Sequence, residues 1–214
     1  MAFIGSPRRP EIDQYTIRFL VGAIALLLPW VEIALTRGAI ASISESYWWT
    51  GAPWPRNLLV GCLFAIAAFM AAYNGRDEIE MWLGKLGAAA ALGIALFPCS
   101  CGDPARQLVP RVHALAVAAM FGVLGAFCLI FRARARAKGH REAQRRAAIY
   151  GVCGIGMLFA LGLFGIEAAL GIARLAFWAE TLGLMSFGIS WLTASRVLPG
   201  ITGADERQRL LVRD

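Results

Sequence analysis

This chain of 214 residues contains few charged residues and only two histidines. Charged side chains make up 16% of it, whereas a soluble globular protein carries about 25%. The deficit is concentrated in several apolar stretches, each about long enough to cross a membrane as a helix. We therefore expect an integral membrane protein with little room for a separate soluble domain.

The shortage of histidine limits the metal and cofactor chemistry open to the chain. His140 lies in a basic loop, so two spans cannot share a bis-histidine haem, and a zinc site would need His113 together with carboxylates or cysteines. The sequence also has no Gly-rich phosphate loop, no nucleophile elbow and no basic patch interleaved with aromatic residues. We predict no metal, no cofactor and no nucleic-acid partner.

The chain has five cysteines, and two of them, Cys99 and Cys101, stand at the end of one apolar stretch. A disulfide between cysteines two positions apart is strained, so we expect the pair to act as small buried residues at a helix end. A soft-metal or redox role is the alternative.

Hydropathy predicts an all-α bundle of six membrane-spanning helices joined by short connections. The predicted spans cover about residues 17–35, 57–73, 81–97, 111–131, 147–166 and 175–195. Gly and Ala faces on the third, fourth and fifth spans are expected to pack against neighbouring helices, because lipid supplies no hydrophobic force between them.

The net charge of +7 predicts the orientation of the bundle. Between residues 132 and 146 there are seven Arg or Lys residues and one Glu, a density typical of a cytoplasmic loop. An even number of spans then places both termini in the cytoplasm. We expect a cytoplasmic segment at 1–16, a transmembrane domain at 17–195 and a cytoplasmic tail at 196–214, in the plasma membrane (the inner membrane of a bacterium).

The connection between the first two spans is unusually polar and aromatic. Residues 42–57 (SISESYWWTGAPWPRN) combine hydroxyls, a carboxylate, four aromatic side chains, an arginine and an asparagine. The predicted topology places this segment at the outer membrane–water boundary. Its tryptophans suit an aromatic belt, and a stacking or lipid-covering role is the alternative.

Several ionisable residues within the spans are predicted to lie at the same level as this segment. Glu32 is ~22 Å along the first span, and Glu180 is ~9 Å from the outer end of the sixth. Charged groups at membrane depth are expensive and mark candidate sites. The candidate ligand-binding residues are Glu32, Ser42, Ser44, Glu45, Tyr47, Arg56, Asn57, His113, Glu167 and Glu180.

Three interpretations of these residues remain open. Glu32 and Glu180 can fasten helices together, line a polar cavity that takes a lipid headgroup or small polar ligand, or belong to a proton path. A proton path needs polar groups on the inner half as well, where the sequence offers Lys85 beside Asp77, Glu78 and Glu80, which we interpret as a surface ion-pair cluster.

The motif Ile43-Ser44-Glu45, followed by Pro55-x-Asn57-Leu58, resembles the first outer loop of the Frag1/DRAM/Sfk1 family and related bacterial six-span families. The family's Thr-Gly after the acidic residue is displaced, since Ser46-Tyr47 follow here and Thr50-Gly51 comes later. The resemblance covers the span layout of most of the chain. It implies lipid-related membrane work, with no cofactor.

The sequence thus favours a lipid- or small-amphiphile-binding or accessory membrane protein over an enzyme. One alternative is a membrane-embedded hydrolase or transferase that uses Ser44, His113 and Glu32. Another is a structural subunit of a larger membrane complex. Expected partners are membrane lipids, with a membrane-protein partner or a homo-oligomer possible.

Overall fold

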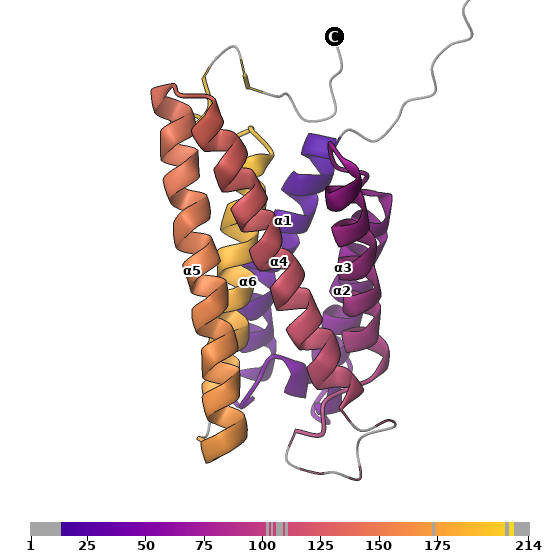
Figure 1. Ribbon diagram of the computed structural model, residues 1–214. Helices are drawn as coiled ribbons and strands as arrows, with labels where there is room; N and C mark the ends of the chain where they lie inside the picture. Colours follow the sequence, from indigo (N-terminus) through magenta and orange to yellow (C-terminus); the bar gives the residue numbers. More distant parts are fainter. Residues whose placement is uncertain are drawn as a thin grey trace, which may run out of the picture.

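The computed structural model describes residues 14–101, 103, 105, 109, 111–172, 174–203 and 206–207. Six α-helices run up and down between two ends of one bundle (Figure 1), and a short 3-10 helix, η1, lies between the first two. The elements are α1 (Gln14–Thr36), η1 (Ser44–Trp48), α2 (Trp54–Ala72), α3 (Glu78–Leu96), α4 (Val112–Ala137), α5 (Arg141–Leu170) and α6 (Leu175–Ala194). Among the described residues, the only β pairing is an isolated bridge between Pro199 and Thr202.

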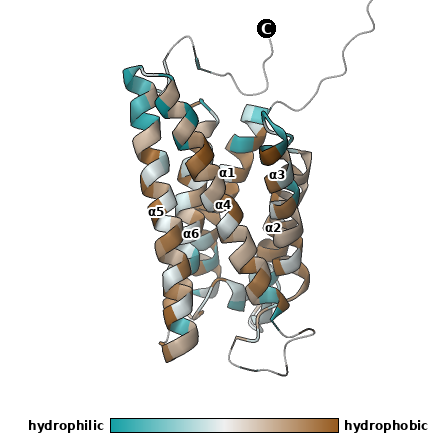
Figure 2. Cartoon of the chain, viewed as in Figure 1, coloured by the Kyte–Doolittle hydropathy of each residue, from teal (hydrophilic) through white to brown (hydrophobic). Residues whose placement is uncertain are grey.

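Each of the six α-helices is long and apolar enough to cross a membrane. Figure 2 shows the apolar residues along the middle of the helices and hydrophilic residues gathered where α4 ends and α5 begins. Over the described residues, the prediction of a helical fold with six helices long enough to span a membrane is confirmed, and these helices suggest an integral membrane protein.

The helices form a closed ring. Each packs against the next in the order α1, α2, α3, α4, α5 and α6, and α6 returns to pack against α1. The two ends of the ring are different. We call the end where α1 begins and α6 finishes the basic end, and the opposite end, which carries η1, the η1 end.

Local sequence sets several helix boundaries. Pro55 stands in the first turn of α2, where its missing N–H is not needed. The Asp77 side chain caps α3 by accepting from the backbone N–H of Glu80 at 2.9 Å. Gly171 ends α5 with φ at +61°, a left-handed conformation that glycine adopts without strain.

The predicted loop over 132–146 is wrong. The structure continues α4 to Ala137 and starts α5 at Arg141, so the turn is only three residues long. Arginine and alanine are good helix formers, and Arg134 and Arg136 in the last turn of α4 are favourable at the negative end of its dipole. The 30 residues of α5 span about 45 Å, more than the ~30 Å hydrocarbon core. The joined ends of α4 and α5 reach past the start of α1 (Figure 1).

Aromatic side chains fill the middle of the six-helix ring. Trp191 is completely buried and lies 5.2 Å from Phe187, 5.5 Å from Phe127 and 5.4 Å from Tyr73, measured between side-chain ring centroids. We call these four residues the aromatic layer. It lies between two cavities, one toward each end of the bundle, which are described below.

Candidate functional site

Glu180, in the second turn of α6, holds the start of η1. Its carboxylate accepts hydrogen bonds from the backbone N–H groups of Ile43 and Ser44 and from the Ser44 hydroxyl. The side chain is 8% exposed. A carboxylate that accepts backbone N–H groups at a helix start satisfies donors that the helix cannot pair itself. Two of the predicted site residues, Ser44 and Glu180, are therefore in direct contact.

Glu32 is completely buried in α1, and neither of its carboxyl oxygens has a hydrogen-bond partner in the described part of the chain. Ser46, also buried, lies beside it without meeting hydrogen-bond geometry. Buried polar groups are normally paired. Glu32 and Ser46 thus form an unsatisfied polar pair between α1 and η1.

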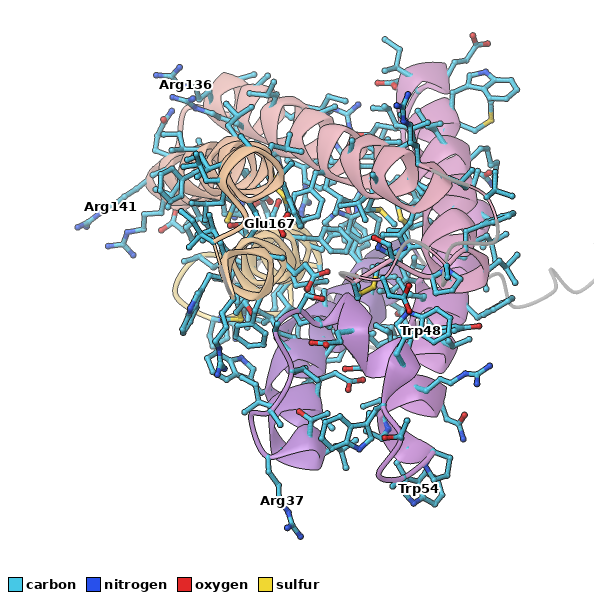
Figure 3. All side chains as sticks on the ribbon, turned by 90° about the horizontal axis from the view of Figure 1, so that it is seen from below. Arg37, Trp48, Trp54, Arg136, Arg141 and Glu167 are labelled. Atoms are coloured by element: carbon cyan, nitrogen blue, oxygen red, sulfur yellow. A yellow bond between two sulfur atoms is a disulfide. The ribbon has the colours of Figure 1, made fainter. Side chains whose placement is uncertain are left out.

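The remaining residues of the 42–57 segment form a rim at the η1 end. The Arg56 guanidinium lies 4.6 Å from the centroid of the Tyr47 ring, a cation–π contact. The Trp48 indole N–H donates to the Cys99 carbonyl oxygen at 2.9 Å, which ties η1 to the end of α3. In Figure 3 Arg37 and Trp54 point away from the bundle.

Other predicted site residues of this segment make local contacts. The Ser42 hydroxyl accepts from the backbone N–H of Glu45 at 3.1 Å, and the Glu45 carboxylate accepts from the N–H of Ala41 at 2.5 Å. Asn57 is exposed at the start of α2. These contacts shape the loop without converging on one point.

His113 and Glu167 come from other helices. His113 Nδ1 lies 2.8 Å from the carbonyl oxygen of Phe97, so this histidine bridges the start of α4 to the end of α3. Glu167 is half-buried in the last turn of α5. Within the described part of the chain, neither residue hydrogen-bonds to Ser44, whose hydroxyl donates to Glu180.

The expectation that Cys99 and Cys101 are unbridged is wrong, because the structure joins them by a disulfide. Their Cα atoms are 5.2 Å apart, within the usual range for a bridge. Cys101 has φ at +46°, and this turn brings the chain back on itself over one intervening residue. The bridge lies next to η1, through the contact of Trp48 with Cys99.

An apolar cavity of about 70 Å³ lies inside the six-helix ring, on the η1 side of the aromatic layer. It is lined by hydrocarbon from α1, α2, α3, α4 and α6, including Leu63, Val117 and Leu184, and one end is formed by Ser44 and Glu180. The predicted polar residues therefore close an apolar space from one end. The space is much smaller than the usual small-molecule site, so it suits only a short apolar segment beside a polar end.

At the basic end, the prediction of a surface ion-pair cluster is wrong for Glu80. Glu80 is completely buried and contacts the Tyr73 hydroxyl, the backbone N–H of Arg76 and the Arg134 guanidinium. Lys85 instead donates to the Ala71 carbonyl. The sequence places Glu80 near the start of a span but does not show which way its side chain faces. Sequence reasoning therefore did not identify the residues around Glu80 at the basic end as a candidate site.

The described residues offer little support for metal or nucleophilic chemistry. No group of three or more His, Cys, Asp or Glu side chains among them is placed to hold a metal ion. The Ser44 hydroxyl donates to the Glu180 carboxylate, not to a histidine. Comparisons with protein-family models, curated proteins and solved structures gave no match to this chain.

Proposed function

We propose that this protein binds a lipid or small amphiphile inside its helical ring, from the outer leaflet, and acts without catalysis. The observation that carries the proposal is the apolar cavity that ends at Ser44 and Glu180. An acyl segment would occupy the hydrocarbon-lined space, and the polar part of the ligand would lie toward η1. The lipid-related roles implied by the resemblance to the Frag1/DRAM/Sfk1 family agree with this proposal.

The proposed orientation places the basic end in the cytoplasm and the η1 end outside, in a plasma or bacterial inner membrane. The concentration of Arg and Lys around the α4–α5 turn supports it. The Cys99–Cys101 disulfide at the η1 end gives independent support, because disulfides persist on the oxidising side of such a membrane. Nothing in this orientation depends on the identity of the ligand.

The hydrogen-bond partners of Ser44, the candidate nucleophile, and His113, the candidate base, favour binding over hydrolysis. A hydrolase needs its nucleophile hydrogen-bonded to a base that a third group orients. Here the Ser44 hydroxyl donates to Glu180, while His113 is held by the Phe97 carbonyl. The same contacts explain why Ser44 and Glu180 are buried: they anchor η1 over the end of the cavity.

The test is to fill the cavity and measure the lipid that co-purifies with the protein. Val117→Phe adds a larger side chain to the cavity wall, whereas Ile155→Phe makes a similar change on a residue of α5 that is 68% exposed. Excluding two methylene groups weakens binding by about 1.6 kcal/mol, or about fifteen-fold. We expect mass spectrometry to show that loss for Val117→Phe only.

A second variant, Glu180→Gln, tests the polar end of the cavity. We expect it to change which lipid classes are retained, because an amide replaces the carboxylate that holds η1 over the end of the cavity. Circular dichroism and gel filtration establish that each variant is folded. Unchanged amount and identity of bound lipid in both folded variants would refute the proposed function.

A further inference from the structure

A second cavity, of about 290 Å³, opens inside the basic end of the ring, on the far side of the aromatic layer from the first. Its volume is close to the lower end of small-molecule sites. Residues of α1, the α2–α3 turn, α4, α5 and the segment after α6 contribute to its wall. Six cations line it: Arg18, Arg76, Arg134, Lys138, Arg146 and Arg196.

Three carboxylates neutralise only part of this charge. Arg134 pairs with Asp77 at 2.5 Å and with Glu80, and Glu206 pairs with Lys138 and with Arg146 at 2.6 Å. Within the described residues, Arg18, Arg76 and Arg196 have no carboxylate within ion-pairing distance. Among the described residues, six cations against three carboxylates leave an excess of three positive charges around the cavity.

Arg18 gives the strongest indication that a ligand is required. This side chain in α1 is only 4% exposed. One terminal nitrogen donates to the Tyr73 hydroxyl at 2.5 Å and the other to the Ala194 carbonyl at 3.3 Å, while its Nε has no acceptor. Both partners are uncharged. A buried cation without a paired counter-charge is destabilising, so an anion in the cavity that Arg18 lines would offset that effect.

The surroundings hold Arg18 in place for such an anion. Its guanidinium carbon lies 5.3 Å from the Tyr73 ring centroid and 5.1 Å from that of Phe131. Tyr73 in turn donates its hydroxyl proton to Glu80 at 3.1 Å. Glu80 is thus occupied by Tyr73, Arg76 and Arg134 and does not neutralise Arg18 directly.

We propose that the cavity at the basic end binds a phosphate-bearing anion, with Arg18 and Arg196, whose guanidinium groups both lie near the Tyr15 ring, as its ligands. Guanidinium groups match the geometry of phosphate oxygens and bind them through paired hydrogen bonds. An excess of three positive charges suits a phosphomonoester or diphosphate better than a single carboxylate. This site is separate from the proposed amphiphile site and does not depend on it.

The phosphate has two possible sources, a soluble cytoplasmic compound or the headgroup of an inner-leaflet lipid. Inorganic pyrophosphate represents the soluble source, and its effect on the thermal unfolding midpoint of the full-length protein in detergent gives an apparent affinity. Nanodiscs of phosphatidylcholine with or without phosphatidic acid represent the lipid source, and native mass spectrometry detects retained lipid. Sodium chloride at matched ionic strength controls for screening.

The variants are Arg18→Gln and Arg196→Gln, compared with Arg136→Gln. Arg136 carries the same charge at the same end but is exposed and points away from the bundle (Figure 3). We expect pyrophosphate or phosphatidic acid to bind the wild type and Arg136→Gln alike. Loss of a hydrogen bond to a charged group weakens binding by about ten-fold or more, so Arg196→Gln and Arg18→Gln should show that loss.

Binding by pyrophosphate supports a soluble ligand, and retention of phosphatidic acid alone supports a lipid headgroup. The proposal is overturned if neither probe binds, if chloride stabilises the protein as well as pyrophosphate, or if Arg136→Gln and Arg196→Gln lose the same affinity. Arg196 is only half-buried, so its variant decides the question even if Arg18→Gln does not fold. The proposed lipid binding at the η1 end can be refuted without changing any of these outcomes, because it concerns the other cavity.

Discussion

At the scale of single residues, Glu206 fastens the segment after α6 to the turn between α4 and α5. Burial alone would raise the pKa of its carboxyl, but hydrogen bonds from Lys138 and Arg146 outweigh burial and hold the pKa at about 2. Arg146 also donates to the Ile201 carbonyl at 2.6 Å. The segment that follows α6 is therefore held by charged contacts that depend on an ionised Glu206.

These contacts predict how stability changes with pH. A carboxyl whose pKa is lower in the folded state than the usual 4.5 stabilises the fold above pH 4.5, and loses that contribution as pH falls toward 2. We expect Glu206→Gln to lower the unfolding midpoint by about 2–4 °C at pH 7, the shift for ~1 kcal/mol in a chain of this size. The difference in unfolding midpoint between the wild type and Glu206→Gln should disappear as the pH falls from 4.5 to 2. Glu78→Gln, an exposed change at the same end, is the control, and a gap independent of pH would contradict the assignment.

The residues of the η1 end show what sequence can and cannot specify at this scale. Glu32 and Glu180 stand out because a polar group in an apolar stretch must have a reason to be there, and Ser44 stands out as part of the polar connection. Their pairing could not be predicted, since sequence gives the height of a residue along a helix but not the partner it faces. For the same reason Glu80 was assigned to the surface, although it is completely buried.

At the scale of elements, α1 and α6 approach each other closely through two glycines. A Cβ atom built on Gly188 would lie 2.8 Å from the carbonyl oxygen of Gly22 and 2.5 Å from Leu26 Cγ. Small residues at helix contacts were predicted, but on other helices. Gly162 of α5, which was expected to pack, has no atom within 4 Å of such a Cβ.

These two positions give a matched pair of substitutions. Gly188→Ala must push α1 away from α6, because a backbone oxygen cannot rotate aside, and overpacking of this kind destabilises by about 1–3 kcal/mol. Gly162→Ala places the same methyl group in open space and should leave stability unchanged or slightly increased. Unfolding in a denaturing detergent titration measures both. Equal stability of the two variants would show that the α1–α6 contact is not as close as described.

At the scale of the whole molecule, the up-and-down order of the helices followed from hydropathy alone, because six apolar stretches of sufficient length leave few other arrangements. The closure of the ring by α1 against α6 did not follow, since the choice of neighbours depends on side-chain packing between distant segments. The two cavities depend on that closure. The cavities therefore could not be predicted from the sequence, although charged residues that line each of them stood out in it.

The orientation of the whole bundle can be measured on intact cells with single cysteines. Thr50 is exposed at the η1 end, and Gln144 is exposed near the start of α5. We expect a membrane-impermeant maleimide to label Thr50→Cys at once, and Gln144→Cys only after the cells are permeabilised. The wild type, whose free cysteines lie within helices, gives the background. The reverse labelling pattern would invert the topology.

The aromatic layer separates the two cavities inside the bundle. Between the two cavities, Phe127, Phe187 and Trp191 fill the middle of the six-helix ring, and the Trp191 indole N–H has no partner within the described chain. A proton or ion moving from one cavity to the other would have to pass these aromatic rings, which carry no charge. The ligands proposed for the two cavities would therefore be held apart, one on each side of this layer.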